Sequence, residues 1–206
     1  MSSDTARQDA PAPRPGRPRD GRVDRAIVTA ALEVMAESGI SEMRMDEVAA
    51  RAGVGKAAIY RRFESKDEMV AAAIGTLVSE IVVPDTGSTR ADLVELMREA
   101  VVLYGTTIAG RLMPSVVEAM RRDPELARIV RERVVAGRRV ALTEVLERGI
   151  ARGDLRADLD VELALDVLGG PLFYRLLITG GPLDERLAQG VVDLIIESNK
   201  PKDRGK

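Results

Sequence analysis

The 206-residue chain contains neither cysteine nor histidine. Without cysteine there is no disulfide, no thiolate metal site and no cysteine nucleophile. Without histidine, the commonest general base and metal ligand is missing. No constellation of nucleophile, base and orienting group stands out among the other residues, so we expect a protein that is not an enzyme and needs neither cofactor nor metal.

Long apolar runs are missing as well. The first residues lack the apolar core of a signal peptide, and no run approaches the roughly 18 apolar residues of a membrane span. We therefore expect a cytoplasmic protein that has no membrane partner.

Residues 45–63, MDEVAARAGVGKAAIYRRF, predict two short helices joined by a sharp turn at Gly53. Val48 and Ala49 give the first helix one apolar stripe, and Ile59 and Phe63, four residues apart, anchor the second helix on the same core. This pattern is typical of a helix-turn-helix DNA-binding motif. An amphipathic helical hairpin with a solvated basic face would show much of the same pattern.

The second of these helices turns one face outward, at 100° per residue from its core positions. Small side chains there would let the backbone approach the floor of a major groove, and an arginine can reach O6 and N7 of guanine. Phosphate contacts would come from its two flanks. The predicted base-facing residues are Ala57, Ala58 and Arg61, and the predicted flanking residues are Lys56, Tyr60 and Arg62.

The neighbouring segments support the DNA-binding interpretation. A helical apolar pattern runs from Val23 to Ser38 and stops at Gly39. A further helix begins after Ser65, where Glu68 completes a capping-box pattern. Lys66, in its first turn, has the wrong sign for the helix dipole but the right sign for a phosphate.

Charge is concentrated at this motif. The whole chain carries a net charge of −2, yet the stretch from Arg51 to Lys66 holds five cations and one anion, a net charge of +4. A solvated basic face would explain such a run by itself, but here it coincides with the outward side of the motif. Local charge, not the total, attracts phosphates.

Residues 50–66, ARAGVGKAAIYRRFESK, resemble the DNA-binding motif of the tetracycline-repressor family of bacterial transcription regulators, and the resemblance extends over residues 23–75. It implies a helical fold and a role in transcription. It also implies that Lys56, Tyr60 and Lys66 hold phosphates while Ala57, Ala58 and Arg61 face bases. Many relatives carry threonine where this chain has Met43 and Arg44, and serine where it has Gly55. Arg44 would replace a hydroxyl–phosphate contact by a charged one.

The N-terminal residues 1–22 are rich in alanine, proline and arginine, and we expect a disordered basic arm. It contains RPGRPR at residues 14–19, which prolines and glycine keep extended. Arg17 would then enter an A·T-rich minor groove, as in AT-hook peptides. A basic leader that only adds non-specific affinity is the alternative.

A break at residues 84–88, PDTGS, separates two predicted domains. We expect a DNA-binding domain over residues 23–83, a helical effector-binding and dimerisation domain over 89–198, and a tail over 199–206. The expected helices of the second domain span 90–109, 114–122, 124–153, 158–178 and 183–198. No strand pattern competes, so the predicted fold class is all-α.

The helix expected over 158–178 is apolar nearly all round and must be covered on two sides. We expect it to pair, together with the helix over 183–198, with the same helices of a second copy. The alternative is that both helices only complete the core of the monomer. The predicted interface consists of Leu165, Leu168, Gly169, Leu172, Leu176, Leu187, Val191, Leu194 and Ile195.

An apolar cavity for a small-molecule effector between the long helices is a further hypothesis. Arg175 stands out, because a guanidinium in an apolar segment needs a carboxylate, a ligand anion or an interface partner. Ordinary core packing is the alternative for every one of these residues. The candidate ligand-binding residues are Met97, Tyr104, Thr107, Met113, Val117, Met120, Phe173 and Arg175.

The sequence thus predicts a regulator that binds double-stranded operator DNA in a sequence-specific way, acts as a homodimer and is released by a small molecule. The alternative is an architectural DNA-binding protein that has no base readout and would bind unrelated duplexes alike.

Overall fold

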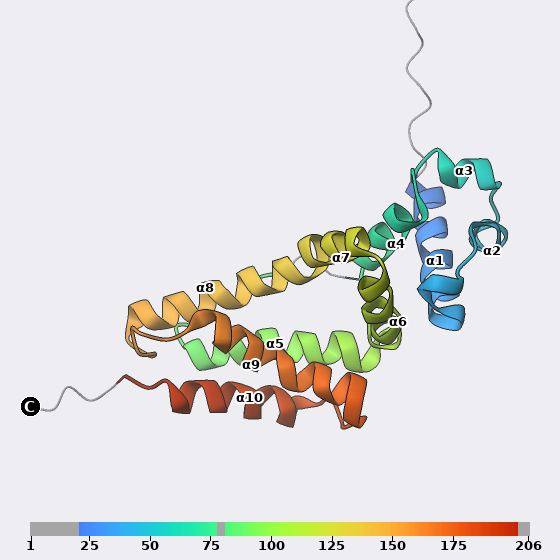
Figure 1. Cartoon of the computed structure of the whole chain (residues 1–206). Coiled ribbons are helices and arrows are strands. Elements are labelled where there is room, and N and C mark those ends of the chain that lie inside the picture. Colours follow the sequence, from blue (N-terminus) through green and yellow to red (C-terminus); the bar gives the residue numbers. More distant parts are fainter. Residues whose placement is uncertain (1–20, 78–80, 202–206) are drawn as a thin grey trace, which may run out of the picture.

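The computed structural model describes residues 21–77 and 81–201. Residues 1–20 of the predicted basic arm, Arg17 among them, lie outside the described residues. Gly21 and Arg22, also expected in the arm, already belong to the first helix. Within the described residues every regular element is helical, as the sequence predicts. Figure 1 shows two ends: a group of small helices at one end and a bundle of longer helices at the other.

The group at the first end contains four helices. A glycine with a positive φ of 83°, Gly39, interrupts the first of them where the sequence predicts its end. At the fourth helix, the Ser65 hydroxyl accepts a hydrogen bond from the Glu68 amide at 3.0 Å, while the Glu68 carboxylate accepts one from the Glu64 amide at 2.5 Å. The predicted cap therefore forms. The helices are α1 (Gly21–Glu42), α2 (Met45–Arg51), α3 (Lys56–Tyr60) and α4 (Lys66–Gly75).

The rest of the described chain forms six α-helices and two π-helical segments, one between α7 and α8 and the other directly after α9. The long run expected over 124–153 is continuous and ends at Gly153, which has a φ of 80°. The elements are α5 (Thr89–Thr106), α6 (Ile108–Arg122), α7 (Pro124–Val130), η1 (Arg131–Val135), α8 (Ala136–Arg152), α9 (Val161–Tyr174), η2 (Arg175–Thr179) and α10 (Glu185–Ser198).

The expected boundary between the helices over 90–109 and 114–122 was wrong. The chain bends by 83° between α5 and α6, and the Thr107 hydroxyl caps α6 by accepting a hydrogen bond from the Ala109 amide at 3.1 Å. Pro114 lies inside α6 instead of starting it. Gly110 makes the bend possible, because a Cβ at this position would lie 1.8 Å from the Tyr104 carbonyl oxygen.

The buried side chains form two cores, and the break at residues 84–88 does not separate them. The first core joins α1–α4 to Leu112 and Val116 of α6 and to Leu126 of α7. The second joins α5, α8, α9 and α10. Figure 1 shows α6 and α7 beside α1 and α4, between the small helices and the long bundle. Helices α6 and α7 thus follow the break in sequence but pack into the first core.

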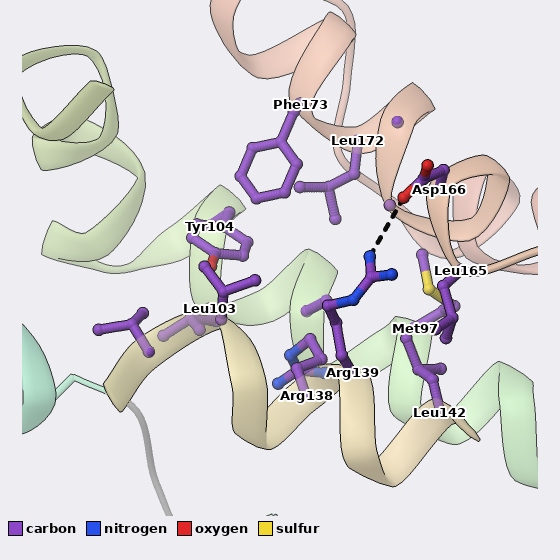
Figure 2. Close-up of a pocket in the computed structure, with 15 residues that line it drawn as sticks. Met97, Leu103, Tyr104, Arg138, Arg139, Leu142, Leu165, Asp166, Leu172 and Phe173 are labelled. Atoms are coloured by element: carbon purple, nitrogen blue, oxygen red, sulfur yellow. Dashed lines mark hydrogen bonds and ion pairs between the residues drawn. The ribbon is translucent and has the colours of Figure 1, made fainter. Parts of the chain in front are cut away.

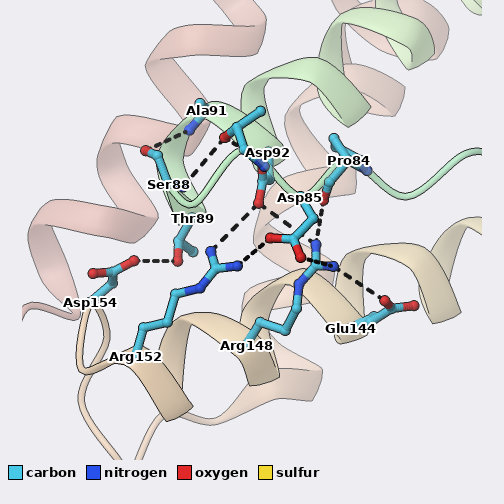
Figure 3. A network of polar contacts seen from close by, with 11 residues as sticks. Pro84, Asp85, Ser88, Thr89, Ala91, Asp92, Glu144, Arg148, Arg152 and Asp154 are labelled. Atoms are coloured by element: carbon cyan, nitrogen blue, oxygen red, sulfur yellow. Dashed lines mark hydrogen bonds and ion pairs between the residues drawn. The ribbon is translucent and has the colours of Figure 1, made fainter.

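A buried carboxylate ties the beginning of α5 to the end of α8 (Figure 3). Asp92 is fully buried and accepts hydrogen bonds from the Thr86 amide at 2.9 Å and the Thr86 hydroxyl at 2.6 Å. Its second oxygen lies 3.6 Å from a nitrogen of Arg148 and 3.7 Å from one of Arg152. Because a buried charge needs compensation, these contacts hold the start of α5 against the end of α8.

Among the residues that the structure describes, no one helix combines the length and the apolar composition needed to cross a membrane. Only the bent pair α5–α6 does so when both members are counted together.

Candidate DNA-binding face and effector cavity

The predicted turn between α2 and α3 forms. Gly53 has a φ of 66°, a conformation that side-chain-bearing residues rarely adopt, and the Val54 amide donates to the Ala49 carbonyl at 3.0 Å. Ile59 is fully buried and Phe63 is 8 % exposed, so both anchor α3 on the first core. Helices α2 and α3 therefore have the arrangement of a helix-turn-helix motif.

Arg61, the C-cap of α3, turns outward, and its guanidinium has no partner among the residues that the structure describes. Ala57 and Arg61 are exposed and Ala58 is half-buried. The Arg61 side chain forms no hydrogen bond or ion pair with any residue in the described part of the chain. Tyr60 is 49 % exposed on the flank. A free guanidinium beside two small side chains suits contact with a base edge at close range.

The net charge of +4 over residues 51–66 overstates the charge that is free to meet DNA. Three of the five cations in this stretch pair with acids outside it. The pairs of Arg51 and Lys56 lie at the surface and are individually weak, so a phosphate can replace the acid there. The pKa of Asp46 lies below its ordinary value because of the hydrogen bond from the Lys56 ammonium. The pairs are Arg51 with Glu37 at 2.7 Å, Lys56 with Asp46 at 2.8 Å, and Arg62 with Asp24.

Arg62 lies where the sequence did not predict it. Its side chain is only 18 % exposed. The guanidinium binds Asp24 of α1 and also donates to the Ala58 carbonyl at 3.0 Å. Arg62 therefore holds the end of α3 on α1 instead of pointing to a phosphate. The partner is 38 residues away in sequence, so helical periodicity gives no sign of it.

Two other predicted phosphate contacts lie next to this face. The Lys66 ammonium donates to the Ser41 carbonyl at 2.9 Å, which brings the start of α4 to the end of α1. Arg44 is exposed and directly precedes α2. Gly55 precedes α3 without a side-chain cap, as its lack of a side chain requires.

A cavity of about 430 Å³ lies between α5, η1, α8 and α9 (Figure 2). Its walls are mostly apolar. Tyr104 and Phe173 meet edge to face there, with ring centroids 5.2 Å apart. The lining residues are Met97, Ala100, Leu103, Tyr104, Val134, Val135, Arg138, Arg139, Leu142, Leu165, Asp166, Gly169, Gly170, Leu172 and Phe173.

Few charged groups line this cavity. Arg138 donates to the Leu96 carbonyl at 2.8 Å, and its pKa is lowered by desolvation. Arg139 donates to the Asp166 carboxylate at 3.1 Å. Burial also raises the pKa of the Tyr104 hydroxyl. The cavity is thus an apolar space with two guanidinium groups in its wall.

Three of the eight predicted ligand-binding residues, Met97, Tyr104 and Phe173, line this cavity. The others lie elsewhere. The 83° bend after α5 carries the residues of α6 away from the second core, and Arg175 lies on η2, beyond the end of α9. Thr107 caps α6 at the bend. Arg175 donates to the Pro182 carbonyl at 2.7 Å, so its partner is a backbone oxygen. Met113 and Met120 pack against the first core, and Val117 is 38 % exposed.

Sequence reasoning missed Arg138 and Arg139, although a signal was present. Val134, Arg138 and Leu142 follow one another at intervals of four residues, which places Arg138 on the apolar stripe of the long helical run. A cation on such a stripe indicates a functional position.

Most residues predicted for the dimer interface belong to the interior of one chain. Leu168, Leu187, Val191 and Ile195 are buried in the second core, and Leu165, Gly169 and Leu172 line the cavity. Leu176 is half-buried and Leu194 is 63 % exposed. The buried apolar stripe of α9 belongs to the second core, which it shares with α5, α8 and α10 of the same chain. A second set of apolar side chains remains exposed on α9, η2 and α10: Leu163, Val167, Tyr174, Ile178 and Leu194.

Comparison with known proteins agrees with this architecture. Residues 27–73 match the model of the bacterial regulatory proteins of the tetR family, and residues 83–195 match that of the tetracyclin repressor-like C-terminal domain. The HTH-type transcriptional regulator YdeS of Bacillus subtilis is 35% identical over 178 residues, 86% of this chain and 89% of its own length. The DNA-binding transcriptional repressor TetR of Mycobacteroides abscessus is 33% identical, over 83% of this chain and 90% of its own.

A solved structure of FadR from Bacillus subtilis in complex with stearoyl-CoA superposes with a TM-score of 0.70 at 21% identity, covering 84% of this chain and 97% of that one. The fold and the exposed face of α3 define a helix-turn-helix DNA-binding protein. The chain belongs to the tetR family of bacterial transcription regulators.

Proposed function

We propose that this protein is a repressor that binds operator DNA as a homodimer and leaves it when an effector enters the cavity. The observation that carries the proposal is the combination of an unpaired, outward Arg61 on α3 with an apolar cavity of about 430 Å³ in the same chain. The relative from Mycobacteroides abscessus is named a repressor, and the FadR structure holds stearoyl-CoA.

In this proposal Ala57, Ala58 and Arg61 face base edges in the major groove. Lys56, Tyr60, Lys66 and Arg44 contact phosphates around them. Lys56 exchanges its exposed partner Asp46 for a phosphate, at a cost of about 0.2–1 kcal/mol for a surface ion pair. Arg62 acts differently, by holding α3 at the correct angle through Asp24.

The homodimer forms through the exposed apolar side chains of α9 and α10. Leu163, Val167 and Tyr174 follow one another at helical spacing on α9, and Leu194 lies on α10. Large apolar side chains on adjacent helices favour a partner of the same kind. A second copy of the chain supplies that partner and adds the second reading head that a two-fold operator requires.

The effector acts on the DNA-binding helices through a shared wall. Tyr104 and Val134 line the cavity, and both also border a void of about 20 Å³ next to Ile74 and Leu77, at the end of α4. Val134 belongs to the first core, together with α1–α4. A ligand that displaces either side chain therefore shifts the packing of α4, and it favours dimers whose reading heads no longer match the operator.

Selection of bound sequences from a pool of random duplexes tests the proposal. We expect inverted repeats whose half-sites lie about one helical turn apart. Sedimentation of the selected duplex with the protein should give a stoichiometry set by whole dimers. Retention of unrelated duplexes without enrichment would contradict base readout and favour the architectural alternative.

A further inference from the structure

The cavity contains a guanidinium that the folded chain leaves poorly compensated. Arg138 lies on the apolar stripe of α8, one turn from Val134 and one turn from Leu142, and all three line the cavity. Its side chain is only 20 % exposed. Taking a guanidinium out of water is costly unless an opposite charge or several hydrogen bonds replace the lost solvation.

The partners of Arg138 do not match its charge. One guanidinium nitrogen donates to the Leu96 carbonyl at 2.8 Å. The nearest carboxylate in the described part of the chain, that of Glu99, lies 4.0 Å away and is 42 % exposed. A guanidinium has five N–H donors, and apart from the one bonded to Leu96 they have no hydrogen-bond partner in the described part of the chain.

The neighbouring arginine shows the contrast. Arg139 also lines the cavity, but its guanidinium is bound by Asp166 at 3.1 Å and by Glu162. These carboxylates are more than two-thirds exposed, at the rim. The chain therefore neutralises Arg139 with two carboxylates, whereas the more buried Arg138 has only the Glu99 carboxylate at 4.0 Å.

We infer that the effector is an amphipathic organic monoanion, a carboxylate held by Arg138 with its apolar part against Tyr104 and Phe173. This inference rests on the proposed effector site and names its ligand class. A carboxylate fits the fork of N–H donors of a guanidinium. A cavity of about 430 Å³ lies in the usual range of small-molecule sites. The acids Asp166 and Glu162 at the rim oppose a second negative charge, so a phosphate ester or a coenzyme A thioester fits less well.

Titration calorimetry on the full chain tests this with matched probes. The acids are decanoate, dodecanoate and naphthoate, and each is compared with the primary alcohol of the same skeleton. We expect at least one acid to bind about tenfold or more tightly than its alcohol, a difference of about 1.4 kcal/mol. Equal affinity of acid and alcohol, or no binding of any acid, would overturn the inference.

Substitutions then locate the charge. Arg138→Gln should abolish the preference for the acid, and Arg138→Lys should retain part of it because the ammonium keeps the charge. Arg133→Gln is the matched control: it removes an exposed cation of η1 that does not line the cavity, and the preference should persist. Thermal unfolding shows whether each variant is folded. If a variant does not fold, the comparison of acid and alcohol on the unmodified chain still decides the ligand class. A preference that survives Arg138→Gln would assign the anion to another group.

The result is separable from the proposed function. An acid that binds through Arg138 but leaves DNA affinity unchanged would support the ligand class and contradict release from the operator. Specific DNA binding without any binding of the acids would support the DNA-binding role and contradict the inferred ligand class.

Discussion

The bend between α5 and α6 depends on one glycine, and Gly110→Ala tests this directly. The added Cβ would lie 1.8 Å from the Tyr104 carbonyl oxygen and 2.9 Å from its carbonyl carbon. Both atoms belong to the backbone, so no rotamer change relieves the overlap, and α6 must move by more than an ångström. Inserting a methyl group into a packed site costs about 1–3 kcal/mol, and backbone displacement places this case at the upper end.

A loss of about 3 kcal/mol lowers the Tm of a chain of this size by about 6–12 °C. Thermal unfolding followed by circular dichroism measures this shift. Gly137→Ala is the control, because Gly137 lies within α8 and its added Cβ would meet nothing within 4 Å. Alanine is the better helix former by about 0.8–1 kcal/mol, so the control should gain about 2–4 °C. A Tm of Gly110→Ala within about 2 °C of the unmodified chain would refute the account of the bend.

Three further predictions concern stability and assembly. Burial and the neighbouring Asp123 raise the pKa of Asp67. The folded state then holds the proton of this carboxyl more tightly than the unfolded state, so the unmodified chain loses stability as the pH rises above the ordinary pKa of 3.8. Asp67→Asn has no such proton and should not show this loss. Urea unfolding should thus find the variant more stable at neutral pH and equal at low pH; a gain independent of pH would contradict this. Arg62→Ala should lower the free energy of unfolding, measured with urea, by about 1–3 kcal/mol, because the charged hydrogen bonds of Arg62 hold α3 on α1. Arg61→Ala should change it by no more than about 0.5 kcal/mol. Equal losses in the two variants would contradict the different roles of these arginines. Leu194→Glu should sediment as a monomer at micromolar concentration, and a persisting dimer would exclude this face.

The helix-turn-helix motif could be predicted from the sequence because its determinants are local. Ile59 of α3 and Phe63, three residues beyond the end of α3, are both buried, and glycine suits the positive φ at position 53 better than any other residue. The capping pattern at Ser65 and Glu68 also acts over a few residues. Periodicity and turn chemistry report such features, whatever the rest of the chain does.

The packing of α6, of α9 and of Arg62 could not be predicted in this way, because it depends on which helix lies against which apolar face. The apolar pattern of α6 is clear in the sequence, but Met113 faces the first core only because the chain bends after α5. The pattern of α9 likewise does not say that Leu168 faces its own chain while Leu163 is left exposed. Arg62 finds its partner 38 residues away. Such contacts follow from tertiary packing, which a single helical period does not encode.

The central claim is that α3 reads bases through Arg61. Fluorescence anisotropy on the selected operator and on a scrambled duplex of the same length, at a fixed salt concentration of about 150 mM, tests it most directly. We predict tight binding to the operator alone, and a loss of about 1–3 kcal/mol for Arg61→Ala on the operator with little change on the scrambled duplex. Equal binding of the unmodified protein to both duplexes, or an equal loss on both for Arg61→Ala, would contradict the account.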